Sequence, residues 1–292
     1  MESKSTSRRL FPTAHEDAHA ARLHVDSPQC RSSSYRLAFQ DPDFLLQPEL
    51  RPIRLQLELL KTELIQNQMG IVSTVVIFGS ARIPDPATAD ANLVSAKAAA
   101  RGKKGDPAAQ ADLKRAQRDL QRSRYYEEAG KLAGLISRNS PRDELVVVTG
   151  GGPGIMEAAN RGAYESGSQS IGLNIVLPHE QAPNVYITPE LSFQFHYFAI
   201  RKMHFLLRAK ALVAFPGGYG TLDELFETLC LIQTQKVKPM PILLFGRKFW
   251  ERVINFEALL EEGNISADDL RIFQYVETAE AAWSIIAAAN GL

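Results

Sequence analysis

A glycine-dense turn follows an apolar segment at 211–214 and opens a helix-like segment at 222–236. The turn and its continuation at 215–224 read FPGGYGTLDE. Such a turn exposes backbone N–H groups and directs the positive end of a helix outward, an arrangement that binds phosphate. The candidate phosphate-binding residues are Gly217, Gly218, Tyr219, Gly220 and Thr221.

An acid follows this turn at a place where phosphate binding alone needs none. Glu224 lies one turn into the helix, and Glu227 follows on roughly the same face. Two carboxylates behind a phosphate loop suit a substrate with a phosphate at one end and a sugar at the other. The alternative is structural, because Thr221 and Glu224 fit a capping box in which the glutamate only stabilises the helix start.

A second glycine-rich turn, TGGGPGIME at 149–157, follows an apolar segment at 145–148. It resembles the dinucleotide fingerprint, but Glu157 occupies the position of the third glycine, where an anion would repel a pyrophosphate. We therefore do not expect an NAD site. A carboxylate here suits ribose hydroxyls, although it could merely favour the helix dipole. The candidate ligand-binding residues of this turn are Gly151, Gly152, Gly154, Met156 and Glu157.

Two shorter motifs complete the set. Gly79 and Ser80 follow an apolar segment, and they could admit a ligand close to the backbone and donate to a phosphate or ribose, or form an ordinary turn. Arg201 and Lys202 are adjacent on a helix-like segment. Arginine offers a planar fork for phosphate or a developing anion, and lysine could reach the phosphate. A solvated basic pair is the alternative.

The elements that must position these motifs alternate between apolar strands and amphipathic helices. Strands are predicted at 75–78, 145–148, 171–177, 212–215, 241–245 and 273–276, and helices at 155–166, 195–209, 222–236, 249–262 and 279–289. This order predicts an α/β, doubly wound, mainly parallel sheet with helices on both faces. Ligands of such sheets bind at the carboxyl ends of the strands, where all four motifs fall.

The domain organisation predicted from the sequence has three parts. Residues 1–45 lack periodicity and are expected to be a disordered tail. Residues 46–70 form an amphipathic helix, expected to pack on the core through apolar residues at helical spacing: Ile53, Leu57, Leu60, Leu64 and Ile65. Residues 71–292 form the Rossmann-like domain, with a charged helical insertion at about 86–125. Residues 86–139 are predicted to be helical, and glycines and a proline divide them into two helices.

Composition excludes several classes of protein. The 292 residues contain 33 Lys+Arg and 33 Asp+Glu, whereas a nucleic-acid binder usually carries a basic excess. Cys30 and Cys230 fit no metal spacing or disulfide framework, so we expect no bound metal. Two separate cysteines also suit a reducing compartment, and we expect the protein to be cytoplasmic. No apolar stretch reaches the length of a membrane span, so we expect no membrane partner.

The two glycine motifs, with Arg201 and Lys202 between them, closely resemble the LOG ("Lonely guy") family over roughly residues 72–290. The N-terminal extension and the insertion make the chain look like the longer bacterial form. The resemblance implies a Rossmann-like fold and hydrolysis of the N-glycosidic bond of nucleoside 5′-monophosphates, AMP or cytokinin ribotides, to a free base and ribose 5-phosphate. It also implies a homodimer or higher homo-oligomer and no cofactor.

The resemblance also implies roles for individual residues. Arg201 and Glu224 match the catalytic pair of the family, and Gly217 to Thr221 match its phosphate loop. Glu157 matches the acid that contacts the ribose, and Lys202 lies in the basic pair.

Other functions compete with this interpretation. A non-catalytic module that binds a nucleotide or molybdenum cofactor would use similar loops, and the intact Arg201 and Glu224 argue against it. Family members are often labelled lysine decarboxylases, but that activity would require pyridoxal phosphate. No pattern here independently supports a Schiff-base lysine.

Overall fold

The computed structural model describes residues 11–21, 25–103, 105–140, 144–178 and 182–292, and the chain divides into two compact units, Met1–Glu58 and Leu59–Leu292. The described part of the first unit contains three short helices, α1 (Ala14–Ala20), α2 (Pro28–Arg31) and α3 (Pro42–Leu45), and the start of α4 (Arg51–Gln68). Residues 1–10 and 22–24 of the predicted tail lie outside the described residues. The disorder of residues 1–45 stays a prediction.

The second unit is built on a seven-stranded sheet in the order β4-β3-β2-β1-β5-β6-β7, in which all the pairs are parallel. All six residues of β1 are buried, as an apolar strand covered on both faces requires. The fold class predicted from the sequence is thereby confirmed. The strands are β1 (Ser73–Phe78), β2 (Leu145–Thr149), β3 (Ser170–Ile175), β4 (Ser192–Phe195), β5 (Ala209–Ala214), β6 (Ile242–Phe245) and β7 (Phe273–Val276).

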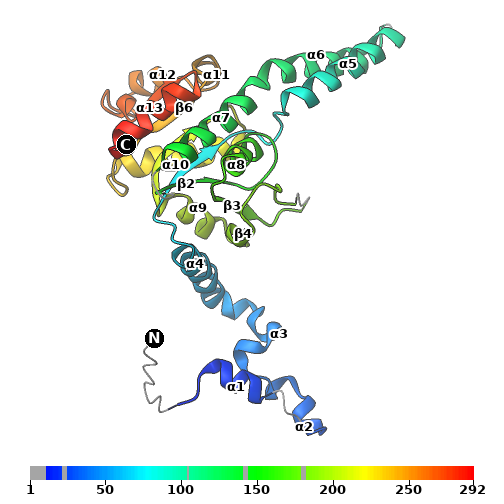
Figure 1. The fold of residues 1–292 in the computed structure, drawn as a ribbon, viewed down its shortest axis with the longest axis vertical. Helices are drawn as coiled ribbons and strands as arrows, with labels where there is room; N and C mark the ends of the chain where they lie inside the picture. The colour runs from blue at the N-terminus through cyan, green and yellow to red at the C-terminus, as the bar shows by residue number, and fades with distance from the viewer. Residues whose placement is uncertain (1–10, 22–24, 104, 141–143, 179–181) are drawn as a thin grey trace. The chain divides into compact units, whose positions relative to one another are not determined.

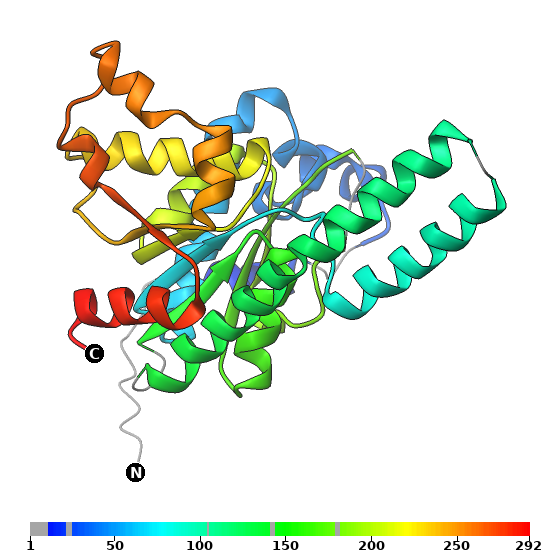
Figure 2. The same cartoon turned by 90° about the horizontal axis from the view of Figure 1, so that it is seen from above.

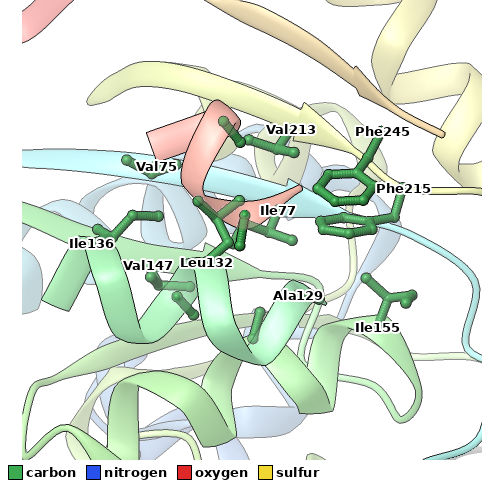
Figure 3. Close-up of a cluster of buried hydrophobic side chains, with 14 of the residues drawn as sticks. Val75, Ile77, Ala129, Leu132, Ile136, Val147, Ile155, Val213, Phe215 and Phe245 are labelled. Carbon is green, nitrogen blue, oxygen red and sulfur yellow. The ribbon is translucent and has the colours of Figure 1, made fainter. Parts of the chain in front are cut away.

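Helices pack on the two faces of this sheet (Figure 1). Helices α7 (Arg124–Asn139), α8 (Ile155–Glu165) and α13 (Ala279–Asn290) close one apolar core (Figure 3). In this core Leu132 and Ile136 are fully buried, and the rings of Phe215 and Phe245 stack with centroids 4.3 Å apart. Further helices of this unit are α9 (Phe198–Leu206), α10 (Tyr219–Gln233), α11 (Arg247–Val253) and α12 (Phe256–Glu261).

Strand β4 was not predicted, because its residues were assigned to the loop and helix start before α9. The predicted helix at 249–262 is two helices, α11 and α12. Between β1 and β2 the described residues form three helices, α5, α6 and α7, where residues 86–139 were predicted to form two. Helices α5 (Pro86–Gly102) and α6 (Pro107–Arg122) form a hairpin that projects from the sheet, and α6 runs through Ser123 into α7 (Figure 2).

The part of α4 that belongs to the second unit contacts that unit through polar residues. Thr62 and Gln66 are buried, whereas Leu60 and Leu64 are 53% and 55% exposed. Glu63 accepts a hydrogen bond from Arg208 at 2.9 Å. The expectation that the two leucines make this contact is therefore wrong, because the ion pair turns the polar face of the helix inward.

Candidate active site

Three loops meet at the carboxyl ends of β1, β2 and β5, the centre of the sheet. The chain winds outward from β1 through β2 to β4 on one side and from β5 to β7 on the other, so β1 and β5 flank the topological switch point. The Ser80 amide donates to the Pro216 carbonyl at 3.1 Å, and the Ile155 amide donates to the Ser80 carbonyl at 3.2 Å. These bonds lock the glycine-containing loops together.

Glycine is required where the loops touch. A Cβ atom on Gly79 would lie 2.5 Å from Ile155 Cγ2, and one on Gly154 would lie 2.5 Å from the Ser80 carbonyl oxygen. Gly154 also has a φ of 70°, a backbone conformation that residues other than glycine rarely adopt. Part of the glycine content therefore serves the packing of the loops.

A cavity of 850 Å³ opens above these strand ends. It brings together ten of the residues that the sequence predicts for the site: Gly79, Ser80, Met156, Arg201, Gly217, Gly218, Tyr219, Gly220, Thr221 and Glu224. Six other predicted residues are not in its lining: Gly151, Gly152, Gly154, Glu157, Lys202 and Glu227.

Arg201 is held at the base of this cavity. Its Nε donates to the Leu173 carbonyl oxygen at 2.7 Å, and its guanidinium carbon lies 5.1 Å from the centroid of the Phe205 ring. A Cβ atom on Gly150 would lie 2.8 Å from Arg201 Nη2, so the glycine leaves room for the guanidinium. Burial lowers the pKa of Arg201, and the Glu224 carboxylate opposes that effect.

Glu224 is buried, with 7% of its surface exposed. Burial raises the pKa of this carboxyl from 4.5 to about 7, against the positive charges of Lys202 and Arg201. An acid whose pKa lies near neutral pH can accept and return a proton in a reaction. The arrangement thus places a proton-transfer group beside a glycine loop.

The first turn of α10 differs from the capping-box alternative. The helix begins at Tyr219 with Gly218 as its N-cap and no side-chain capping bond. Thr221 is therefore inside the first turn, and Glu224 is not the N3 acid of a threonine cap. Gly217 packs directly against the Thr221 side chain, where a Cβ atom would clash. The amides at the start of α10 remain available to an anion in the cavity.

Lys202 lies on the outer side of the same helices. Its Nζ forms ion pairs with Asp223 Oδ2 at 2.8 Å and with Glu227 Oε2 at 2.9 Å. These three residues line a separate surface hollow together with Tyr219. The structure thus puts Lys202 and Glu227 outside the cavity, where their pairing links α9 and α10.

Glu157 is half-buried, and its Oε1 accepts a hydrogen bond of 2.9 Å from the Tyr126 hydroxyl. The neighbouring carbonyls of Gly151 and Gly152 accept hydrogen bonds from Asn184 Nδ2, at 3.1 Å each. The Asn184 amide group also donates to Asn160 Oδ1 at 3.0 Å. This side of the second glycine turn is therefore engaged in holding the turn itself.

Helix α6 contributes cavity residues that were not predicted from the sequence. Arg115, Arg118 and Arg122 line the same cavity as the glycine loop, as does Arg82 after β1. The three α6 arginines are three and four residues apart, a spacing that puts them on one helix face. That spacing in the sequence could have indicated a basic helix face.

The described residues contain no group of three or more His, Cys, Asp or Glu residues arranged to hold a metal ion. None of the helices in the described ranges is long and apolar enough to cross a membrane.

Comparisons with known proteins agree with the motifs. Residues 156–286 match the family model described as possible lysine decarboxylase. The chain is 29% identical over 140 residues to the probable cytokinin riboside 5′-monophosphate phosphoribohydrolase LOG4 of Oryza sativa subsp. japonica, covering 47% of this chain and 60% of the relative. It is 28% identical over 164 residues to cytokinin riboside 5′-monophosphate phosphoribohydrolase LOG3 of Arabidopsis thaliana, covering 54% of this chain and 73% of that relative.

Solved structures are more distant. TM1055 is 19% identical with a TM-score of 0.45, over 74% of this chain and 99% of that protein. The molybdenum cofactor carrier protein of Chlamydomonas reinhardtii is 17% identical with a TM-score of 0.43, over 75% of this chain and 99% of that protein.

The chain spans 60% and 64% of the lengths of the two rice relatives LOG4 and LOGL3. The family model and the curated relatives confirm the resemblance that the motifs predict: the chain is similar to the LOG phosphoribohydrolases.

Proposed function

We propose that the protein hydrolyses the N-glycosidic bond of nucleoside 5′-monophosphates, AMP or cytokinin ribotides, to a free base and ribose 5-phosphate. The observation that carries the proposal is the burial of Glu224, with a pKa of about 7, in the cavity that Arg201 and the glycine loop share. The names of the relatives in rice and Arabidopsis support the same reaction class.

The 5′-phosphate binds at the start of α10, where free amides and the helix dipole favour an anion. The ribose then extends toward Glu224. Cleavage of the bond between C1′ and the base nitrogen builds positive charge on the ribose. The ionised Glu224 carboxylate stabilises this charge and takes a proton from the attacking water, whose oxygen bonds to C1′. Glu224 then returns that proton to the departing base, so the carboxylate is ionised again at the end of the reaction.

Arg201 acts beside this carboxylate. Because its Nε is committed to the Leu173 carbonyl, the two Nη groups are the part of the fork that remains for the substrate. We assign them to the negative charge of the phosphate or of the departing base. No metal or cofactor takes part in the proposed steps.

Glu157 is proposed to bind the ribose hydroxyls. In the structure its carboxylate is occupied by Tyr126, so direct binding requires the ribose to share or replace that hydrogen bond. A Tyr126→Phe variant frees the carboxylate oxygen. If Glu157 grips the ribose, this variant changes the KM for AMP, whereas a purely structural pair changes only the Tm.

The protein is further proposed to act in the cytoplasm as a homodimer or higher homo-oligomer, without nucleic-acid or membrane partners. Apolar side chains exposed on and just after α9, beside the cavity, support a second copy as the partner: Phe198, Met203 and Leu207, at 52%, 46% and 52% exposure. Light scattering coupled to size exclusion measures the assembly, and a monomer at micromolar concentration would contradict the proposal.

The test of the reaction is to incubate the purified protein with AMP, isopentenyladenosine monophosphate and adenosine, and to measure base release by chromatography. We expect base from the two monophosphates and little from adenosine, since adenosine lacks the group that the glycine loop binds. Glu224→Gln is expected to bind AMP without releasing base, and Glu261→Gln, on the exposed end of α12, serves as the matched control. If the native protein binds AMP tightly but releases no base, the proposed hydrolase activity is refuted and a nucleotide- or cofactor-binding module is favoured.

A further inference from the structure

The lining of the cavity is rich in arginine. One face of α6 contributes Arg115, Arg118 and Arg122, and the loop after β1 contributes Arg82. Together with Arg201 this makes five arginines in the lining against three carboxylates, Asp119, Asp223 and Glu224. The whole chain has a net charge of zero, so the positive charge is concentrated at this cavity.

The carboxylates neutralise these arginines only in part. Arg118 lies 3.5 Å from Asp119, its neighbour in sequence, and Arg115 is paired with Asp112 at 2.9 Å. Arg122 is half-buried, and within the described part of the chain its guanidinium has no ion pair shorter than 4.0 Å. Burial lowers the pKa of Arg122, so its charge is held there at a cost that a bound anion would offset.

The proposed reaction leaves these arginines without a role. A single 5′-phosphate is accommodated by the start of α10. From Arg115 to Arg122 the arginine face of α6 rises by seven steps of 1.5 Å, or roughly 10 Å, which is longer than one phosphate group. The cavity of 850 Å³ is also near the upper end of the range of roughly 300–1,000 Å³ seen for small-molecule sites.

We infer that the arginine face of α6 binds a second phosphate, and that the cavity accepts nucleoside 5′-diphosphates. The inference rests on the proposed function, because the glycine loop is taken to hold the first phosphate and the second extends from it toward Arg118 and Arg122. Arginine suits this task, since its planar fork pairs with two phosphate oxygens at once.

The test compares ligands that differ by one phosphate. Calorimetry measures the Kd of inorganic phosphate, pyrophosphate, AMP and ADP with the full chain. We expect pyrophosphate to bind about tenfold or more tightly than phosphate, and ADP than AMP, a factor that corresponds to about 1.4 kcal/mol. In the Arg118→Ala/Arg122→Ala variant this preference should disappear while the affinity for phosphate is kept.

Lys114→Ala is the matched control, because Lys114 is an exposed cation of α6 outside the cavity lining. It should retain the preference. Circular dichroism establishes that the double variant is folded, and single Arg118→Gln and Arg122→Gln variants replace it if it is not. The inference is overturned if ADP and AMP bind equally to the native protein, or if the variants weaken both by the same factor.

The proposed function and this inference fail in different ways. A protein that releases no base from AMP, yet prefers ADP through the α6 arginines, refutes the reaction and keeps the diphosphate site. A protein that releases base from AMP and shows no preference for ADP keeps the reaction and refutes the diphosphate site.

Discussion

Replacement of Glu224 by glutamine should make the protein more stable while abolishing its proposed activity. The carboxyl is buried, and its pKa rises from 4.5 to about 7 in the folded protein. At about 1.36 kcal/mol per pKa unit, that shift corresponds to about 3 kcal/mol of lost stability once the group is ionised.

The sign follows from proton binding. Between pH 4.5 and 7 the folded state holds a proton at Glu224 that the unfolded state has lost, so stability falls as the pH rises through this window. Below pH 4.5 both states are protonated and the penalty vanishes. Above pH 7 the penalty is complete. Glutamine resembles the neutral acid in shape and escapes the penalty at every pH.

The assay is thermal unfolding of the native protein and of Glu224→Gln at pH 4.5 and pH 8, in buffers without phosphate. A domain of this size gains roughly 2–4 °C in Tm per kcal/mol, so the variant should unfold roughly 6–12 °C higher at pH 8 and at nearly the same temperature at pH 4.5. The exposed Glu261→Gln control should show neither difference. Equal Tm values for Glu224→Gln and the native protein at pH 8 would refute the reasoning, because the burial of a charged acid would then carry no penalty.

Three further substitutions test the placement of the cavity residues. Gly217→Ala should raise the KM for AMP about tenfold or more, since the new Cβ meets the Thr221 side chain and shifts the phosphate loop; an unchanged KM in steady-state kinetics contradicts this. Gly150→Ala should lower kcat about 100-fold because its Cβ displaces Arg201 Nη2 and the Met156 sulfur, whereas a normal kcat would show that the guanidinium position is unimportant. Arg201→Lys should lower kcat/KM about 100-fold, since lysine lacks the fork and the bond to Leu173, and wild-type kinetics would remove Arg201 from the proposed mechanism.

Local sequence patterns predicted most of the sheet but not the edge strand β4. The strand at 145–148 is continuous in apolar residues, and β2 is buried throughout. Strand β4 has four residues of mixed burial, and it is defined by its pairing with β3, in which Phe193 lies opposite Leu173. A strand of that length is stabilised by its neighbour across the sheet, so its own residues carry little signal.

The candidate site shows the same division between local and distant causes. The glycine loop and Glu224 are contiguous in sequence, so their chemistry was visible as a motif. The contact of Glu157 with Tyr126 joins residues 31 positions apart and depends on how α7 packs on α8. The arginine face of α6 was predictable as a helix face, but its position over the cavity depends on the path of the α5–α6 hairpin.

The phosphate and Glu224 should influence each other, and pH profiles can show it. A bound 5′-phosphate brings negative charge near a buried carboxylate, and like charges raise the pKa of an acid. The profile of kcat/KM reports the free protein, and that of kcat reports the complex. We therefore expect kcat/KM for AMP to rise with pH through about 7, because the ionised Glu224 acts as the base, and kcat to rise at a higher pH. If instead kcat rises at the same or a lower pH, the arginines of the cavity neutralise the phosphate completely. In that event the bound phosphate would not raise the pKa of Glu224 above its value in the free protein.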